Sequence, residues 1–155
     1  MLLIAIDPGA TGGIATMNSH DGRVVVIKMP DTPKDILELF GGLGCMDGQV
    51  KAVMEGISSG VFHHSGQGGA AQKAASMCKL HRHCGHVEMA LIATGIPFES
   101  VSPQKWQKSM GALPKDLAAR KRKIKDLMQR KHPNVKVTLW NADALGILEW
   151  AKANA

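Results

Sequence analysis

The sequence predicts one α/β domain, residues 1–155, built on a mixed five-stranded sheet that is flanked by helices. Three observations support this fold class. Five short apolar runs, each typical of a buried strand, alternate with turn residues or with segments of helical periodicity. The 155 residues match one ordinary domain, and an apolar content of 45% allows a substantial core. No internal repeat or low-complexity linker divides the chain.

The first three strands are expected to form an antiparallel meander. Leu2–Ile6 is a continuous apolar run, and Gly12–Met17 and Arg23–Lys28 are two further short runs, of which the second is rich in valine. The segment Asn18–Gly22 between them consists of strong turn formers, which favours a hairpin.

Helices and two more strands complete the predicted domain. In order, they are a helix from Pro33 to Gly41, a strand at Val50–Met54, a helix at Ala70–Thr94, a strand at Phe98–Val101, a short helix from Pro103, and helices at Lys115–Lys131 and Asn141–Ala153. Thr32 is the expected N-cap of the first helix, and Gly41 and Gly42 are expected to end it. Gly56–Gly69 contains five glycines and is too polar for a core element, so we expect a surface loop of functional length.

Composition excludes several classes of protein. No apolar run approaches the roughly 18 residues that cross a membrane, and the apolar start meets Asp7 without a charged leader, so neither a membrane span nor a signal peptide is expected. Three cysteines make no disulfide framework and fit a reducing cytoplasm. The net charge of +6 suggests a polyanionic partner, whereas an aromatic content of 4% argues against a base-stacking platform.

Three acidic residues stand where α/β sheets bind ligands. Asp7 and Glu55 follow two apolar strands that we expect to be parallel neighbours, and ligands bind beyond the carboxyl ends of such strands. Asp143 opens the last helix, which could pack beside them. Each acid alone could be an N-cap or a turn residue. Gathered together, carboxylates repel one another unless a hard cation neutralises them, so Mg²⁺ or Mn²⁺ is expected, with two ions about 3.5–4 Å apart able to hydrolyse a phosphodiester.

Residues 103–136 are strongly basic. They hold eleven Lys or Arg against two Asp, a local charge of +9, whereas the rest of the chain sums to −3. Such a run is often only the solvated face of a helix, but beside a carboxylate cluster it would hold DNA by its phosphates. The candidate DNA contacts are Lys105, Lys108, Lys115, Arg120, Lys121, Arg122 and Lys123.

An ordered set of short motifs spans the chain from about residue 2 to 150. The set comprises Ile6-Asp7-Pro8-Gly9 with Thr11-Gly12-Gly13, Met54-Glu55, Gly66-Gln67-Gly68, Gly85-His86-Val87-Glu88, Ser102-Pro103 with Trp106, and Ala142-Asp143-Ala144-Leu145. It resembles the RuvC-like Holliday junction resolvases, and more closely their short, phage-encoded branch. The resemblance implies a ribonuclease H-like fold and a homodimer that nicks two symmetric strands of a four-way DNA junction with divalent metal. It also implies that Lys108 and Lys115 lie near the family's phosphate-contacting lysines.

The chain departs from the pattern of this family at one place. The family usually carries a fourth acid or a histidine three or four residues before the final aspartate, where this chain has Trp140 and Leu139. Asn141 or Thr138 could offer a weak oxygen ligand, water could fill the place, or the second metal is poorly held and activity is low. Binding depends less on this ligand, because phosphate contacts do not need it.

Phe62 is an unusual residue for the polar loop in which it lies. Members of the family use an aromatic residue near this place as a wedge at the junction centre. We therefore expect Phe62 either to pry or stack at the crossover or to fold back onto the core.

The long helix carries a group of histidines and cysteines. These are Cys78, His81, His83, Cys84 and His86. They fan around the helix axis at about 100° per residue, so they cannot converge on one tetrahedral site and no structural zinc is expected. The histidines are candidates to face phosphates or a dimer partner, and Cys78 and Cys84 are expected to be small buried residues.

The function that best joins these observations is a metal-dependent endonuclease for branched DNA. Asp7 would bridge the ions, and Glu55 and Asp143 would hold one each. The main alternative is a protein that binds DNA junctions but cleaves them weakly or not at all. An actin-like ATPase would need two such domains around its nucleotide, and a transposase would need an added targeting domain, for which 155 residues leave no room.

Overall fold

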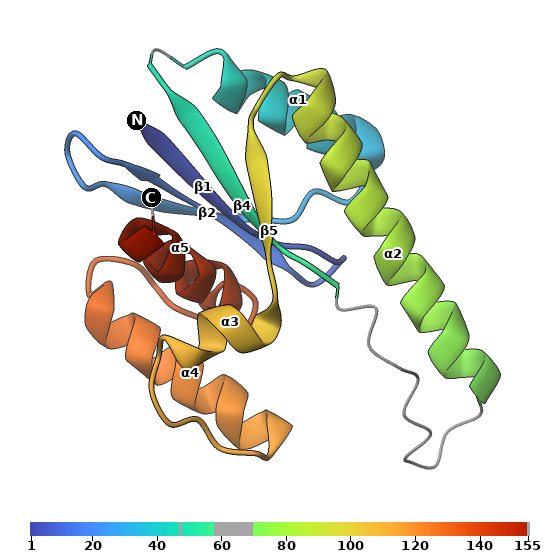
Figure 1. Cartoon of the computed structure of the whole chain (residues 1–155), viewed down its shortest axis with the longest axis vertical. Coiled ribbons are helices and arrows are strands. Elements are labelled where there is room, and N and C mark those ends of the chain that lie inside the picture. The colour runs from blue at the N-terminus through green and yellow to red at the C-terminus, as the bar shows by residue number, and fades with distance from the viewer. Residues whose placement is uncertain (47, 58–69, 155) are drawn as a thin grey trace.

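The computed structural model describes residues 1–46, 48–57 and 70–154 and confirms the α/β fold class, with a mixed five-stranded sheet between two groups of helices (Figure 1). The strands are β1 (Leu2–Asp7), β2 (Gly13–Asn18), β3 (Val24–Lys28), β4 (Val50–Glu55) and β5 (Phe98–Val101). The helices are α1 (Pro33–Gly44), α2 (Ala70–Ala93), α3 (Pro103–Lys108), α4 (Leu117–Lys131) and α5 (Ala142–Asn154).

The sheet has the strand order β3-β2-β1-β4-β5. Strands β1, β2 and β3 pair antiparallel, which confirms the predicted meander, and β4 and β5 are added in parallel on the other side of β1. Ile6 of β1 lies opposite Met54 of β4. The carboxyl ends of these two central strands therefore reach the same edge of the sheet.

Alternate side chains of the central strands supply two separate cores. Ile4 of β1 packs with Phe40 of α1 and Leu91 of α2 on one face. Leu3, its neighbour in β1, packs with Leu145 of α5 on the other face, where α3 and α4 also lie (Figure 1). Successive side chains of a strand point to opposite faces, which explains why the apolar runs are continuous rather than alternating.

Helix α5 lies directly on the sheet and is buried over most of its circumference. Its buried residues are Ala142, Ala144, Leu145, Gly146, Ile147, Leu148, Trp150 and Ala151. It packs against β1, β2 and β4. This packing fixes the position of the first turn of α5, which carries Asp143.

Helix α1 begins as predicted but ends later. The Thr32 hydroxyl caps it by accepting a hydrogen bond from the Asp35 backbone N–H at 3.1 Å. The predicted end at Gly41 and Gly42 is wrong, since the helix continues to Gly44. Core packing on the flanking turns of α1 outweighs the low helix propensity of glycine.

Ion pairs join α4 to α5 through the Glu149 carboxylate. Its oxygens lie 2.7 Å from Lys152 Nζ, 3.0 Å from Lys131 Nζ and 3.3 Å from His132 Nε2. The pKa of Glu149 is held well below its usual range, mainly by His132 and also by the two lysines, while burial opposes this shift. The carboxylate is therefore a charged anchor between the two helices.

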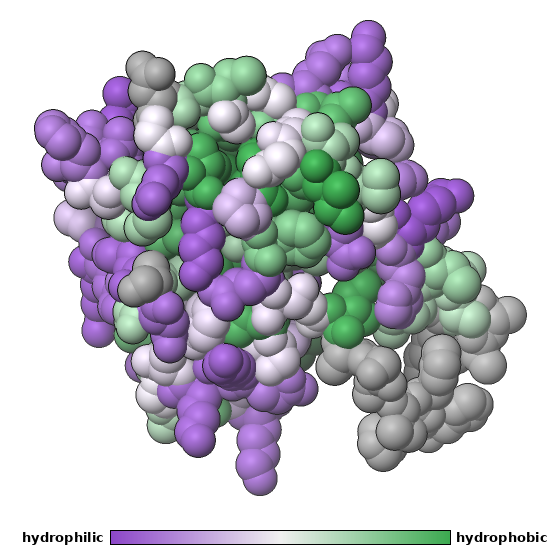
Figure 2. All heavy atoms as spheres, turned by 45° about the horizontal axis from the view of Figure 1, so that its top comes forward, coloured by the Kyte–Doolittle hydropathy of each residue, from purple (hydrophilic) through white to green (hydrophobic). Residues whose placement is uncertain are grey.

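Hydrophilic side chains project from much of the surface, with hydrophobic residues gathered in between on the face that Figure 2 shows. None of the helices in the described part of the chain is long and apolar enough to cross a membrane.

Candidate active site

The structure brings the three predicted acids to one edge of the sheet. Asp7 ends β1 and Glu55 ends β4, and these strands are parallel neighbours. Asp143 lies in the first turn of α5, which packs against β1. All three side chains are partly buried, and Asp7 interacts electrostatically with both of the others.

Burial and mutual repulsion oppose ionisation of these carboxyls. Burial raises the pKa of Asp7 to about 8, and repulsion from Glu55 and Asp143 adds to the effect. Burial is also the main reason why the pKa values of Glu55 and Asp143 are raised. Lys121 lowers the pKa of all three, and a hydrogen bond from Trp106 lowers that of Glu55. When ionised, the three carboxylates would therefore carry more negative charge than the nearby Lys121 ammonium can neutralise.

The donor chemistry of this edge fits a hard divalent cation. Carboxylate oxygens are ligands that Mg²⁺ and Mn²⁺ prefer, and a bound cation would favour the ionised forms. Among the described residues, no group of three or more His, Cys, Asp or Glu side chains is already arranged to hold a metal ion. The edge thus offers suitable donors and unbalanced charge, but not a closed ligand cage.

The turn between β1 and β2 directly follows Asp7, and its conformation depends on two glycines. Gly9 has a φ of 122°, a conformation that glycine adopts readily. The Gly12 backbone N–H donates to the Gly9 carbonyl at 2.9 Å, and a Cβ on Gly12 would lie only 2.1 Å from the Asp7 carbonyl oxygen. The close approach requires a glycine there. This steric requirement accounts for Gly12 in the glycine-rich sequence after Asp7, and no phosphate-binding role is needed to explain it.

Helix α2 holds the same turn through His83. The Gly9 backbone N–H donates to His83 Nδ1 at 3.1 Å, so the imidazole accepts in its neutral form. Burial, and then the nearby His86, lower the pKa of His83, which favours this neutral form. We expected His83 to face a phosphate or a dimer partner, but its Nδ1 instead accepts a hydrogen bond from the β1–β2 turn.

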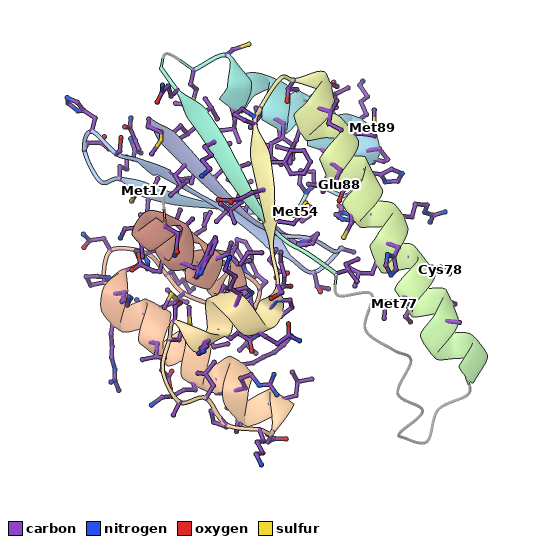
Figure 3. All side chains as sticks on the ribbon, in the orientation of Figure 1. Met17, Met54, Met77, Cys78, Glu88 and Met89 are labelled. Carbon is purple, nitrogen blue, oxygen red and sulfur yellow. The ribbon has the colours of Figure 1, made fainter. Side chains whose placement is uncertain are left out.

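The cysteines of α2 differ from each other. Cys84 is buried, as predicted, and burial, followed by repulsion from Glu88, raises the pKa of its thiol to about 11. The prediction of a buried Cys78 is wrong: this residue is exposed on the outer side of α2, near Met77 (Figure 3). The spacing on the helix did not reveal that the sheet ends before this turn.

Glu55 is fixed by a residue from α3. The indole N–H of Trp106 donates to Glu55 Oε1 at 2.8 Å, and the Trp106 side chain is 0% exposed. In the sequence, Trp106 stands out only as part of the motif with Ser102-Pro103. One signal could have revealed its role: a buried tryptophan usually finds an acceptor for its N–H, and α3 follows a strand adjacent to Glu55.

The region before Asp143 is packed rather than open. The ring of Trp140 lies against Gly13, where an added Cβ would come within 3.0 Å of it, and Gly13 pairs with Asp7 in the sheet. Asn141 is 1% exposed, and its amide oxygen accepts from the Thr138 N–H at 2.8 Å while its amide nitrogen donates to the Lys136 carbonyl at 3.1 Å. The side chain that we considered as a weak metal ligand is thus engaged with the backbone.

Some of the candidate DNA contacts line a shallow hollow between α3 and the start of α4. Lys108, Lys115 and Arg120 contribute to this hollow of about 300 Å³. Arg120 also donates to the carbonyls of Pro114 at 3.2 Å and Lys115 at 2.8 Å, which fixes the loop before α4.

The other basic candidates have different surroundings. The Lys105 ammonium lies 5.1 Å from the centroid of the Trp150 ring, a cation–π contact. Lys121, Arg122 and Lys123 are exposed on α4. Of these, Lys121 is the one that acts on the carboxylates of the sheet edge. The predicted wedge Phe62 lies outside the described residues.

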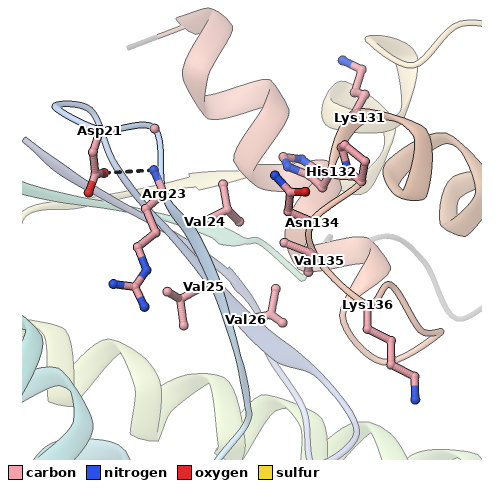
Figure 4. A pocket seen from close by; sticks show the side chains of 12 residues that line it. Asp21, Arg23, Val24, Val25, Val26, Lys131, His132, Asn134, Val135 and Lys136 are labelled. Carbon is pink, nitrogen blue, oxygen red and sulfur yellow. Dashed lines mark hydrogen bonds between the residues drawn. The ribbon is translucent and has the colours of Figure 1, made fainter.

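A larger hollow lies away from the acids. It measures about 700 Å³, and it is bordered by the β2–β3 turn, by β3 and by the segment after α4 (Figure 4). Arg23 and Val24, at the start of β3, and Asn134 line it. Since Val24 pairs with Met17 and not with the Gly13 end of β2, this hollow begins at the opposite end of the strands from Asp7. The candidate active site lies at the other end, at the edge of the sheet where β1 and β4 end.

Comparisons of the sequence with protein-family models and with curated proteins give no match. Among solved structures, RuvC of T. thermophilus in complex with a Holliday junction substrate aligns with a TM-score of 0.57 and 16% identity, covering 95% of this chain and 89% of that chain. A structure of Thermus thermophilus RuvC aligns with a TM-score of 0.54 and 17% identity, covering 99% and 97%. The chain therefore has the RuvC-like, ribonuclease H-like fold that its motifs predicted.

Proposed function

We propose that the chain is a metal-dependent, structure-selective endonuclease that resolves four-way and other branched DNA junctions by paired symmetric nicks. The observation that carries this proposal is the cluster of three partly buried carboxylates, with raised pKa values, at the edge of a RuvC-like sheet. Branched DNA as the substrate is supported by the likeness to a RuvC structure that holds a Holliday junction. The motif set favours the phage-encoded branch of such enzymes.

Asp7, Glu55 and Asp143 would hold one or two Mg²⁺ or Mn²⁺ ions. When bound, such ions activate water and stabilise the leaving oxygen of a phosphodiester. The chain itself contributes the fixed strand ends that carry Asp7 and Glu55, and the ammonium of Lys121 beside them. That ammonium would attract the scissile phosphate and stabilise charge that develops on it.

The basic surface of α3 and α4 would position the DNA. Lys108, Lys115 and Arg120 line one hollow, so a phosphate there would meet three positive side chains. Lys121, on α4, acts electrostatically on all three acids, so it would extend the basic surface toward them. Contacts of this kind carry no base sequence information, and they make the affinity strongly dependent on salt.

A homodimer would supply the two active sites that paired nicks need. Two large apolar side chains on the outer side of α2, Met89 and Ile92, are 60% and 61% exposed. They are three residues apart, so they lie on one side of the helix; Figure 3 labels Met89 on α2. A second copy of α2 packed there would bury them.

The second candidate is a protein that binds junctions with little or no cleavage. The packing of Trp140 against Gly13 favours it, because an apolar ring stands where RuvC-like enzymes usually carry a fourth metal ligand.

Cleavage of a synthetic four-way junction separates the two candidates. The assay compares the junction with a linear duplex of the same sequence, in Mg²⁺, in Mn²⁺ and in EDTA, at one stated salt concentration. The endonuclease predicts metal-dependent nicks at symmetric positions in two strands of the junction. Tight junction binding without nicks in either metal would favour the binding protein, and equal affinity for duplex and junction would contradict structure selectivity.

A further inference from the structure

Trp106 links the Glu55 carboxylate to the helix that carries Asp143. Its indole N–H donates to Glu55 Oε1 at 2.8 Å. The other side of the ring lies on α5 at Gly146, where an added Cβ would come within 2.7 Å of Trp106 Cζ3. Gly146 is three residues after Asp143, one helical turn along α5. The indole therefore spans the space between Glu55 and the helix that carries Asp143.

The position of the indole is set by its local structure. The Ser102 hydroxyl caps α3 by accepting from the Lys105 N–H at 3.3 Å, and Pro103 occupies its first turn. This places Trp106 one turn into the helix, facing inward. The ring is fully buried and packs in the core with Leu145, so the surrounding side chains hold it in place.

The hydrogen bond from Trp106 distinguishes the two carboxylate oxygens of Glu55. Oε1 is engaged by the indole, and within the described residues no other hydrogen bond to this side chain is present. As far as the described residues show, Oε2 is the oxygen that would bind a cation. A carboxylate with one oxygen fixed loses less conformational freedom when it binds a metal, and partners of this kind also orient the ligand.

We propose that Trp106 is a positioning residue for the metal site: its indole N–H orients Glu55, and its ring, seated on Gly146, sets the spacing between Glu55 and Asp143. This inference rests on the proposed function, in that it requires Glu55 and Asp143 to bind a divalent cation. It assigns Trp106 no contact with DNA or with the reacting atoms.

The test measures Mn²⁺ binding to the whole protein by calorimetry and by electron paramagnetic resonance. Trp106 is replaced by β-(3-benzothienyl)alanine, which keeps the shape of the indole but has sulfur in place of N–H. We expect Mn²⁺ affinity to fall by about tenfold or more, the range found when such supporting hydrogen bonds are lost. The matched control is Trp150→Phe, which alters a buried tryptophan of α5 that contacts Lys105 instead of Glu55; its affinity should stay within about twofold of wild type.

A second measurement remains informative if the substituted protein is less stable. Selective ¹⁵N labelling of the three tryptophans gives one indole signal for each. Addition of Mg²⁺ to the wild-type protein should shift the Trp106 signal more than that of Trp150, because the acceptor of its hydrogen bond would bind the cation.

The outcomes separate this inference from the proposed function. Mn²⁺ binding by wild type that is unchanged in the benzothienyl variant, together with an unshifted Trp106 signal, would overturn the positioning role alone. No Mn²⁺ binding by wild type at millimolar concentration would overturn the metal-dependent function and with it this inference. A weakened affinity that Gly146→Ala reproduces by displacing the ring would support both halves of the proposal.

Discussion

The carboxylate cluster predicts that a substitution at the candidate active site will stabilise the metal-free protein. Asp7→Asn keeps the size of the side chain but removes the charge that is costly to bury. It also removes the repulsion that Asp7 exerts on Glu55. Residues that are arranged for metal binding rather than for stability should behave in this way.

The size and pH dependence of the effect follow from the pKa of Asp7. It is raised from an ordinary value of 3.8 to about 8 in the folded protein. Below about pH 4 the Asp7 carboxyl is protonated in both the folded and the unfolded chain, so it does not lower the free energy of unfolding. As the pH rises from 4 to 8, the unfolded chain ionises first and stability is lost by about 1.4 kcal/mol per pH unit. At pH 7 the loss is roughly 4 kcal/mol, and it levels off above pH 8.

Urea unfolding in EDTA at pH 5 and pH 8 measures this loss. We expect Asp7→Asn to exceed wild type in free energy of unfolding by several kcal/mol at pH 8, and by much less at pH 5. Asp31→Asn, at an exposed position between β3 and α1, is the matched control and should follow wild type at both pH values. Equal stability of Asp7→Asn and wild type at pH 8, or a gain that is the same at both pH values, would refute the argument.

Three other predictions follow from particular contacts. Glu149→Gln should cost about 1–3 kcal/mol at pH 7, and the difference in urea unfolding should shrink as the pH falls below 4.5, because the lowered pKa gives stability only while the carboxylate of the unfolded chain is also ionised. Gly12→Ala should lower the melting temperature sharply, since its Cβ would lie 2.1 Å from a backbone oxygen, whereas Gly42→Ala, with nothing within 4 Å, should not. Lys115→Ala and Arg122→Ala should weaken junction binding for all sequences and reduce the slope of log affinity against log salt by about one each, and an unchanged slope would exclude phosphate contacts.

Much of the fold was predictable because its signals are local. Apolar runs bounded by turn residues located all five strands, and capping residues such as Thr32 and Ser102 marked helix starts. Asp7 and Glu55 could be expected at one edge because parallel strands end together. Predictions failed where tertiary packing decided the result. Glycines inside α1 did not end it, and a cysteine on α2 extended past the sheet edge into solvent.

The supporting contacts of the site were beyond sequence reasoning. The bond from Trp106 to Glu55 joins residues 51 positions apart, and that from Gly9 to His83 joins residues 74 apart. Neither pairing leaves a local pattern, because each depends on how α3 and α2 pack against the sheet. The engagement of Asn141 with backbone groups is local, but its residue type equally suits a cap and a weak ligand.

The central claim is tested most directly by junction cleavage with wild type and Asp7→Asn side by side. Both proteins are brought to the same fraction of bound four-way junction, measured in the same buffer without metal, and cleavage is then started with Mg²⁺ or Mn²⁺. We expect paired nicks with wild type and with the control Asp31→Asn, and none above background with Asp7→Asn although it binds the junction. Cleavage by Asp7→Asn at the wild-type rate would contradict the central claim.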